Sequence, residues 1–414
     1  MRLVHAADIH LDSPLRTLTD KFDDDDLVRM LRQATRRALE NLVELTVAEG
    51  ADALLLAGDI YDGDWQDYAT GRFFVEQMRR LDDAGIRVFM ISGNHDAASE
   101  ITRTLTLPRN VTALGSARPE TVTDDDLGLA VHGQSYASRD IQENLVLAYP
   151  RPIRGLVNVG LLHTAADGAE GHAPYAPCTA DDLTRVGYEY FALGHVHSHR
   201  IVCDGEHVAA FSGNLQGRHS RETGPKGALV VDVEPGRPAL VRHVPCDVAR
   251  WAALTVDVTA CDSVEDVLER AEARLRAARD EAGDRPVVAR VTFTGRSRAA
   301  ADLADEERMH SDLRVAAGRL RVALEKVRSR VASTAPPTAV DPELMDAVRA
   351  ACEEVAGRAD ELPSFIGSLK ALNKEVGRLL QDAGLLDLES TDTLADLARR
   401  AGEGLVARLA GEDG

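Results

Sequence analysis

Five short stretches of the chain carry side chains whose types and spacing could bind metal ions. They are Asp8-Ile9-His10, Gly58-Asp59-Ile60-Tyr61-Asp62, Gly93-Asn94-His95-Asp96, Leu162-His163-Thr164 and Gly194-His195-Val196-His197. Carboxylate, imidazole and amide groups without a thiolate suit manganese, iron or zinc. The candidate ligands exceed what one ion needs and fit two ions that share a carboxylate. They are Asp8, His10, Asp59, Asn94, His163, His195 and His197.

A pair of metal ions in such a site would favour one kind of chemistry. Two ions roughly 3.5–4 Å apart are a recurring arrangement for the hydrolysis of phosphate esters. They lower the pKa of a bridging water and neutralise charge on the phosphoryl oxygens, but the leaving alkoxide still needs a proton. His95 follows Asn94 in a tight loop, so it is placed to act as the general acid.

Each of the five stretches closes or directly follows an apolar run with the character of a β-strand. In open α/β sheets, ligands collect beyond the carboxyl ends of the strands. Side chains two residues apart on an extended segment also point to the same side. We therefore expect the five stretches to converge on one pocket. The runs cover residues 3–7, 53–57, 88–92, 157–162 and 190–193.

The order of elements predicts an α/β domain that closes near residue 246. Helices over about 24–49 and 67–84 alternate with strands at 53–57 and 87–92, which is typical of parallel βαβ units. After Gly115 the strands are short and the helices fewer. We expect these later strands at 128–133, 157–163, 190–193, 207–212 and 228–233.

A smaller α/β unit and a helical region should come next. The unit has strands at 254–258 and 287–294 around a helix at 263–281. From about residue 304 we expect mostly helix, with arginine-rich residues 308–331 forming one helix. Its basic face has three interpretations: ordinary packing, docking of a partner's coiled coil, or contact with a DNA backbone. Its apolar seam in heptad register is Leu313, Ala317, Leu320, Leu324, Val327 and Val331.

The charge balance argues against one class of function. The chain has 68 Asp and Glu against 48 Lys and Arg, a formal net charge of −20 at pH 7. A protein that coats nucleic acid by overall attraction is expected to be basic. Surface charges are largely screened beyond roughly 8 Å in physiological salt, so a local cationic pocket can still bind phosphate.

Nothing in the sequence predicts a membrane segment or a disulfide. No apolar run approaches the roughly 20 residues of a membrane span, and His5 and Asp8 interrupt any signal-peptide core. A cytoplasmic protein without a membrane partner is the expectation. The five cysteines are scattered and show no C-x-x-C pair, so we expect buried free thiols.

The five motifs, D-x-H, G-D-x-x-D, G-N-H-D, H and G-H-x-H, resemble the calcineurin-like metallophosphoesterase superfamily in order and spacing. Residues 6–14, together with 211–214, Glu222 and Lys226-Gly227, resemble its SbcD and YhaO-like DNA repair exonucleases. The resemblance is strong over residues 1–245 and looser over the later parts of the chain. It implies a four-layer αββα sandwich over 1–246, a small α/β cap over 247–303 and a helical partner-binding region over 304–414.

The resemblance also implies a role for each residue. Asp59 would bridge two ions, His95 would protonate the leaving group and Asp62 would orient His95. Related nucleases often carry His at the position of Asp62, and Asp96 is the alternative partner of His95. Asp8, His10, Asp59 and His197 would hold one ion, and Asp59, Asn94, His163 and His195 the other. Substrate-binding residues are not identified; Arg218, Arg221, His199 and His219 lie near the pocket-forming loops.

The function implied by the resemblance is a DNA exonuclease subunit in DNA repair. A metal-bridging hydroxide would attack a DNA phosphodiester, with manganese as the expected ion and iron, zinc or magnesium as alternatives. The resemblance also implies an SMC-like ATPase with a coiled coil as the partner. This chain has no G-x-x-x-x-G-K-[ST] motif, so any ATP dependence would come from that subunit. A homodimer stays open. The alternative functions are a phosphatase or small-nucleotide phosphodiesterase on the same site, or a scaffold that regulates the ATPase.

Overall fold

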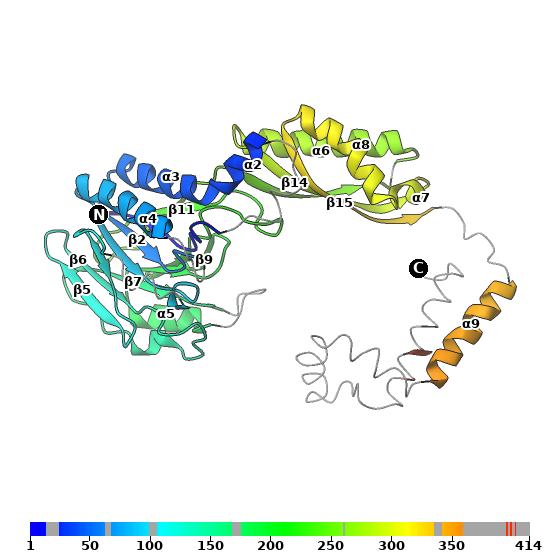
Figure 1. Cartoon of the computed structure of the whole chain (residues 1–414). Coiled ribbons are helices and arrows are strands. Elements are labelled where there is room, and N and C mark those ends of the chain that lie inside the picture. The colour runs from blue at the N-terminus through cyan, green and yellow to red at the C-terminus, as the bar shows by residue number, and fades with distance from the viewer. Residues whose placement is uncertain are drawn as a thin grey trace. The chain divides into compact units, whose positions relative to one another are not determined.

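The computed structural model forms two compact units. The first comprises Met1–Gly295 with Asp302–Val331, and the second comprises Arg296–Ala301 with Ala332–Gly414. In the second unit, the longest described element is helix α9 (Pro342–Gly357). The described residues are 1–13, 25–62, 68–98, 106–167, 175–259, 261–334, 342–358, and single positions 395, 398, 399 and 402 (Figure 1).

Two six-stranded sheets form the centre of the first unit. One has the order β12-β11-β1-β2-β3-β4, with β1 to β4 parallel and β11 and β12 antiparallel. Its strands are β1 (Arg2–Ala6), β2 (Ala53–Ala57), β3 (Arg87–Ile91), β4 (Val111–Ala113), β11 (Gly227–Asp232) and β12 (Leu240–Pro245).

The second sheet has the order β5-β6-β7-β8-β10-β9. Its four central strands are parallel, and β5 and β9 pair antiparallel at its edges. The strands are β5 (Glu120–Asp124), β6 (Leu129–Gly133), β7 (Val157–His163), β8 (Tyr190–Gly194), β9 (Arg200–Cys203) and β10 (Val208–Phe211). Parallel strands end at a common edge, so each sheet gathers the residues that follow its central strands.

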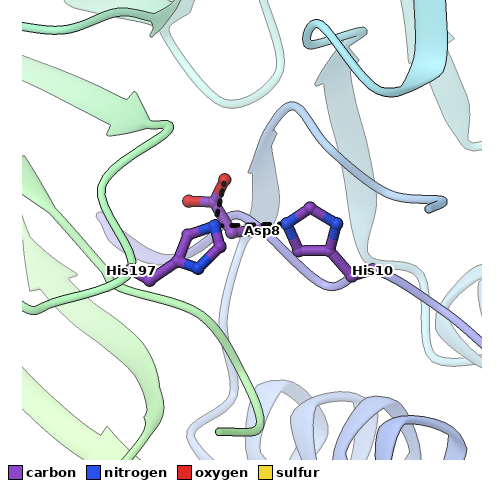
Figure 2. Close-up of side chains that lie close together, drawn as sticks. All are labelled: Asp8, His10 and His197. Atoms are coloured by element: carbon purple, nitrogen blue, oxygen red, sulfur yellow. Dashed lines mark hydrogen bonds and ion pairs between the residues drawn. The ribbon is translucent and has the colours of Figure 1, made fainter. Parts of the chain in front are cut away.

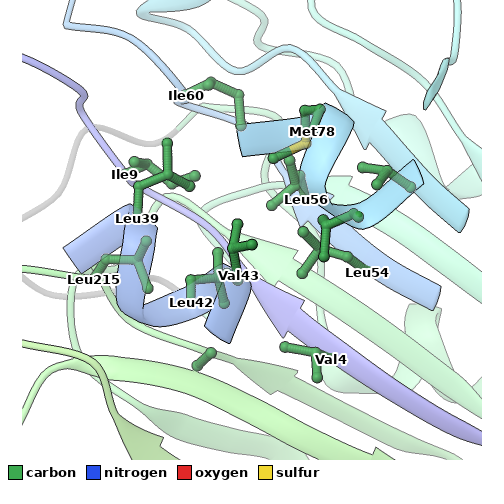
Figure 3. Close-up of a cluster of buried hydrophobic side chains, with 14 of the residues drawn as sticks. Val4, Ile9, Leu39, Leu42, Val43, Leu54, Leu56, Ile60, Met78 and Leu215 are labelled. Carbon is green, nitrogen blue, oxygen red and sulfur yellow. The ribbon is translucent and has the colours of Figure 1, made fainter. Parts of the chain in front are cut away.

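The two sheets pack face to face between helices, which gives four layers (Figure 1). Leu54 and Leu56 of β2 face a core beneath the helices (Figure 3), and Leu55 faces the core between the sheets. A strand buried on both faces needs an uninterrupted apolar sequence, and β2 reads Ala-Leu-Leu-Leu-Ala. The helices are α3 (Ala34–Ala48) and α4 (Tyr68–Asp83) over the first sheet, with η3 (Leu145–Ala148) and α5 (Ala180–Val186) over the second.

Most elements expected before residue 246 are present within one or two residues of their predicted ends. The helix expected over 24–49 is instead two helices, α2 (Asp25–Arg32) and α3, which meet at Gln33. They separate because they pack on different surfaces. Leu31 of α2 packs against Trp251 and Val288, whereas α3 covers the first sheet.

A three-stranded sheet comes next, formed by β13 (Arg250–Asp257), β14 (Val287–Ser297) and β15 (Val322–Ser333) in that order. β13 and β14 are parallel and joined by α6 (Val264–Ala282). Ser263 and Asp266 form a capping box at the start of α6, which satisfies two backbone N–H groups. The predicted strand–helix–strand order is therefore confirmed, and α7 (Ala300–Leu303) and α8 (Glu306–Arg319) come after it.

The continuous basic helix predicted over residues 308–331 is wrong. Helix α8 ends at Arg319, and β15 begins at Val322 after Arg321 adopts a left-handed backbone with φ 55°. Leu313 and Ala317 are buried on the helix, but Leu324 and Val327 are buried on the strand. The three interpretations of one basic helix face therefore no longer apply to the whole stretch.

The domain boundary expected after residue 303 is also wrong, because β15 is the third strand of the sheet begun by β13. The small α/β part therefore extends to the end of β15, and the region from 304 is not wholly helical. Residues 359–394 of the expected helical region lie outside the described residues. Among described residues, no helix has the length and apolarity to cross a membrane. All five cysteines are free, and three of them are buried.

Candidate metal centre

The residues of the five motifs meet where parallel strands of the two sheets end. Asp8 follows β1, Asp59 follows β2, and Asn94 follows β3 in the first sheet. In the second sheet His163 is the last residue of β7, and His195 follows β8. The strand ends therefore bring together residues far apart in sequence, as the apolar runs predict.

The backbone at several of these residues is strained. Asp8 (φ 52°), His10 (φ 45°), Asp59 (φ 51°) and His195 (φ 101°) all have positive φ. Such a backbone is uncommon for residues other than glycine, costs roughly 1–3 kcal/mol, and clusters at functional sites. The strain is maintained because the flanking strands are buried and fixed.

Three motif glycines let the His163 ring approach the ends of other strands. A Cβ atom on Gly58, at φ 92°, would lie 2.6 Å from Nδ1 of His163. A Cβ atom on Gly93 or Gly194 would lie 2.8 Å from an atom of the same ring. Because real Cβ atoms do not approach so closely, glycine is required at these positions.

One cluster of ligand atoms joins the β1 and β8 ends (Figure 2). Nε2 of His10 lies 3.2 Å from Nε2 of His197, and the latter lies 3.9 Å from Oδ1 of Asp8. Asp8 and His10 are fully buried, and the His197 side chain is 17% exposed. These three residues offer ligand atoms within 4.8 Å of one another.

A second cluster surrounds Asp59. Its Oδ2 atom lies 3.5 Å from Nε2 of His163 and 3.9 Å from Nε2 of His10. Nε2 of His163 also lies 3.0 Å from Oδ1 of Asn94. Asp59 therefore stands between the two clusters, as expected of a carboxylate shared by two ions. Asp8, Asp59 and His163 again offer ligand atoms within 4.8 Å of one another.

The hydrogen bonds of the three imidazoles test whether cations fit these clusters. Nδ1 of His163 lies 2.9 Å from Ala57 O, and Nδ1 of His197 lies 2.6 Å from Glu222 Oε1. Nδ1 of His10 lies 3.4 Å from Asp62 Oδ1 but has no hydrogen-bond partner among the described residues. Ala57 O and Glu222 Oε1 accept the proton of the Nδ1 that faces them, which leaves Nε2 of a neutral ring as a lone pair. The Nε2 atoms of all three rings face other ligand atoms, so a cation fits between them.

Asp59 and His163 shift each other's pKa values. Burial alone would lower the pKa of His163, but the Asp59 carboxylate outweighs burial and raises that pKa to about 9. Burial would likewise raise the pKa of Asp59, but His163 holds it well below its usual range. The two groups therefore stabilise each other's charged form, and a divalent cation bound here would compete with the proton of His163.

His95 and Asp62 form the pair that the resemblance implies. Nδ1 of His95 lies 3.2 Å from Oδ1 of Asp62, and this hydrogen bond raises the pKa of His95. The His95 side chain is 35% exposed, so solvent reaches it. His95 also lies close enough to His10 and Asp59 to share an ion with them, so its assignment as a proton donor needs a direct test.

Asp96 does not partner His95. Its carboxylate accepts hydrogen bonds from the backbone N–H groups of Ile60, Tyr61 and Gly93. Burial raises the pKa of Asp96 to about 7. The residue thus ties the Asp59 loop to the Asn94 loop, and it is not the alternative partner of His95 that sequence reasoning names.

Glu222 and Lys226 contact the candidate ligand His197, and sequence reasoning assigned neither residue a role. Glu222 Oε1 accepts the Nδ1 proton of His197, and Lys226 Nζ donates to His197 O at 2.6 Å. Both residues therefore hold the candidate ligand His197 through groups other than Nε2. Their resemblance to the nuclease family was the only sequence signal, because neither residue stands near His197 in the chain.

The remaining residues named from sequence take varied positions. His195 lies beside His163 with ring centroids 5.3 Å apart, and its backbone N–H donates to both carboxylate oxygens of Asp8. It belongs to none of the three groups of ligand atoms that involve Asp8, Asp59 or both. His199 stacks on His243 at 5.0 Å, and Arg221 is exposed. Arg218 is the one that reaches Asp62, at 3.5 Å.

Two known families match the sequence. Residues 1–199 match the calcineurin-like phosphoesterases, and residues 251–332 match the middle domain of the metallophosphoesterase YhaO. The uncharacterized metallophosphoesterase YhaO of Bacillus subtilis is 33% identical over 299 residues, which cover 71% of this chain and 72% of that protein. The second family match ends within β15, in agreement with the extent of the three-stranded sheet.

Two further relatives are more distant. The DNA double-strand break repair protein Mre11 of Aeropyrum pernix is 26% identical over 301 residues, covering 68% of this chain and 70% of that protein. A subunit of the nuclease SbcCD of Bacillus subtilis is 25% identical over 282 residues, covering 59% of this chain and 69% of that protein.

Proposed function

The chain belongs to the calcineurin-like metallophosphoesterase family as a relative of YhaO, and on this premise we propose that it hydrolyses phosphodiesters in DNA. The family supports a metal-dependent hydrolase. DNA as the substrate is supported by the names of the distant relatives, which include a double-strand break repair protein and a nuclease subunit.

The single observation that carries the proposal is the orientation of three imidazoles toward one centre. His10, His163 and His197 each present Nε2 to other candidate ligand atoms. Neutral imidazole nitrogens beside carboxylates are ligands for divalent ions. A site built only for packing has no need to hold three imidazole nitrogens toward one another.

Two divalent cations fit the donor set, with manganese proposed and iron, zinc or magnesium as alternatives. Asp8, His10, Asp59 and His197 would hold one, and Asp59, Asn94, His163 and His195 would hold the other. When bound, such a pair lowers the pKa of a water molecule and neutralises charge on the phosphoryl oxygens.

The residues of the chain would then handle the proton of the leaving group. Asp62 accepts from Nδ1 of His95, which leaves Nε2 of His95 to carry a proton to the leaving oxygen. Asp62 is itself held by Ser13, whose hydroxyl donates to Oδ2 at 2.7 Å. The dyad is thus oriented before a substrate arrives.

The test combines cleavage with a count of bound ions. Metal-stripped protein, reloaded with Mn²⁺, is incubated with end-labelled single- and double-stranded DNA, and with model phosphate diesters and monoesters. His95→Ala should retain both ions and lose cleavage by about 10²–10⁴-fold. His207→Ala is the control, because His207 bonds Tyr188 O at the β9–β10 hairpin and should behave as wild type.

Each other outcome would change the role assigned to His95 or the function assigned to the protein. Loss of an ion in His95→Ala makes His95 a ligand rather than the acid. Turnover of the monoester without cleavage of DNA makes the protein a phosphatase or small-nucleotide phosphodiesterase. Absence of any Mn²⁺-dependent turnover in the wild type refutes the phosphodiesterase and leaves the scaffold role.

We further propose an SMC-like ATPase as the partner, in DNA repair. The support is the relationship to a subunit of the nuclease SbcCD and the absence from this sequence of a phosphate-binding loop of the G-x-x-x-x-G-K-[ST] type. Co-elution of the purified chain with such an ATPase in gel filtration tests it. The elution volume of the chain alone tests the homodimer, and separate elution of the two proteins refutes the partner.

A further inference from the structure

Arg218 is held beside the His95–Asp62 pair with donor capacity that the chain does not use. Its Nη1 atom lies 3.2 Å from Ser13 Oγ and 3.5 Å from Asp62 Oδ1. Its Nη2 atom lies 3.9 Å from Glu222 Oε1. Its Nε atom is buried and has no hydrogen-bond partner among the described residues.

A guanidinium group in such a position requires an explanation. It presents five N–H donors in a rigid plane that matches the oxygens of a phosphate. A buried donor without a partner is unfavourable, and an arginine used only as a salt bridge would turn to satisfy it. The Arg218 side chain is only 16% exposed, so bulk water supplies few partners.

The loop that carries Arg218 is fixed from both sides. The Arg218 backbone N–H donates to Glu222 Oε2 at 2.6 Å, while Oε1 of the same carboxylate holds His197. Before Arg218, Gly217 O accepts a 2.9 Å hydrogen bond from Trp251 Nε1. The Gln216 side chain binds the backbone of Ala249 at 2.7 Å. A binding group held in this way loses little entropy when a ligand arrives.

Three donors converge on one carboxylate oxygen. Oδ1 of Asp62 lies 3.2 Å from His95 Nδ1, 3.4 Å from His10 Nδ1 and 3.5 Å from Arg218 Nη1. Asp62 therefore places the arginine, the proposed acid and a proposed ligand side by side. A phosphoryl group beside His95 would lie within reach of the guanidinium.

We propose that Arg218 binds a non-bridging oxygen of the phosphodiester whose leaving group His95 protonates. The inference rests on the proposed function and adds to it a substrate-binding residue for an anionic phosphate oxygen. Arg218 would contribute mainly to substrate binding, because it contacts a group that is anionic both before and during the reaction.

The experiment compares Arg218→Gln and Arg218→Lys with a matched control, Arg221→Gln. Arg221 belongs to the same loop but is exposed, so its replacement removes the same charge without emptying the proposed contact. Bound Mn²⁺ is counted for each protein. Inorganic phosphate is titrated into each Mn²⁺-loaded protein by calorimetry, and KM and kcat are measured with bis(p-nitrophenyl) phosphate.

Arg218→Gln should bind both ions, while the Kd for inorganic phosphate and the KM for the diester rise about 10- to 100-fold, as expected for a charge-assisted hydrogen bond. Its kcat should change less. Arg218→Lys should recover part of the binding, because lysine keeps the charge and loses the planar fork. Arg221→Gln should match the wild type in all three measurements.

Three results would overturn the inference. An unchanged phosphate Kd with a reduced kcat in both Arg218 variants would mean that Arg218 only orients Asp62. Loss of a bound ion would mean that it acts through Glu222 and His197. If the wild-type protein did not bind inorganic phosphate, Arg218 would not be a phosphate-binding residue. Diester turnover by the wild type is read separately, so failure of the proposed function is distinguishable.

Discussion

An imidazole ring binds a metal only through a nitrogen that carries no proton, so the partner of the other nitrogen matters as much as the ligand. Glu222 has this role for His197, since its Oε1 atom lies 2.6 Å from Nδ1. Hydrogen bonds to His197, Arg218 and Asn214 all end on the same carboxylate. Glu222 therefore connects the loop after β10 to the candidate metal centre.

Glu222→Gln should lower metal affinity without unfolding the protein. A glutamine keeps the size of the side chain but binds the Nδ1 proton less strongly, and mutation of such partners typically costs about 10–100-fold in metal affinity. Competition with a chelator gives the Kd for Mn²⁺. The exposed Glu206 offers a matched control, and Glu206→Gln should bind as the wild type. Equal affinity in both variants would refute the role.

A second histidine predicts how stability depends on pH. Burial lowers the pKa of His5 to about 3, and its Nδ1 atom lies 2.8 Å from the Tyr190 hydroxyl. In the unfolded chain the pKa is about 6.5. Between these values the unfolded state binds a proton that the folded state does not. The free energy of unfolding therefore falls as pH falls, by up to about 1.4 kcal/mol per pH unit below about 6.

His5→Gln should reduce this pH dependence. Urea unfolding of the metal-free protein at pH 8, 6 and 5 gives the slope, and the variant should lose less stability than the wild type between pH 6 and 5. Glutamine retains a hydrogen-bonding group for Tyr190. A decrease in the free energy of unfolding that is equal at all three pH values would therefore report the change in packing alone. Parallel curves for the two proteins would show that His5 does not titrate on unfolding.

At the residue scale, the sequence predicts which motif residues meet but not what supports them. Asp8, Asp59 and His163 could be named because each stands beside an apolar run that ends in a motif. Glu222 and Arg218 stand in a loop without such a run, and their contacts with His197 and Asp62 depend on how β8 and β10 are folded together. No local pattern in the sequence encodes that contact.

At the scale of elements, the strand ends depend on glycines, which provides a further prediction. Gly58→Ala places a methyl group 2.6 Å from Nδ1 of His163 at a φ of 92°. The ring must move, so one ion should be lost and the protein destabilised. Gly128→Ala is the matched control, since Gly128 has φ 67° but nothing within 4 Å of its added Cβ.

Both glycine variants introduce the strain of a left-handed alanine, roughly 1–2 kcal/mol. Only Gly58→Ala also crowds His163. Thermal unfolding should therefore show a similar or smaller loss in Gly128→Ala, and a count of bound Mn²⁺ should fall in Gly58→Ala alone. Full metal content in Gly58→Ala would mean that the His163 ring tolerates displacement.

An element could be predicted from the sequence where its apolar residues fit a strand or a helix but not both. The run of leucines in β2 is too short for a helix and comes after a helical stretch, so it could be assigned as a strand. The apolar residues of 313–331 fit a helical period, but the predicted helix is wrong from Val322 onward, because tertiary contacts select a strand there. Val322, Val327 and Val331 are β-branched residues that favour strands. The pairing partner β14 lies well upstream and was not visible in a local period.

At the scale of the whole molecule, the groups proposed to bind phosphate lie in one centre of an acidic chain. The net charge of −20 repels DNA in general, so under the proposed function affinity for phosphate would come from bound cations and from local groups such as Arg218. Raising the salt concentration screens both effects. Binding of short phosphate ligands should depend on salt less than binding of long DNA does.

The extent of the small α/β part allows a test with shortened chains. A chain that ends at residue 303 lacks α8 and β15, which bury Met309, Leu313, Ala317, Val322 and Leu324. Each large apolar side chain contributes about 1.5–3 kcal/mol, so their sum approaches the roughly 5–15 kcal/mol that stabilises a domain. A chain that ends at residue 334 keeps all of them, together with the complete three-stranded sheet.

The chain ending at residue 334 should therefore bind Mn²⁺ and hydrolyse a small diester as the full protein does. The chain ending at residue 303 should be cut rapidly by protease between residues 247 and 303, because β14 loses its partner β15 and α6 loses the helix that packs on it. Limited proteolysis followed by mass spectrometry locates the cuts. Equal protease resistance of the two shortened chains would show that β13, α6 and β14 form a stable unit without β15.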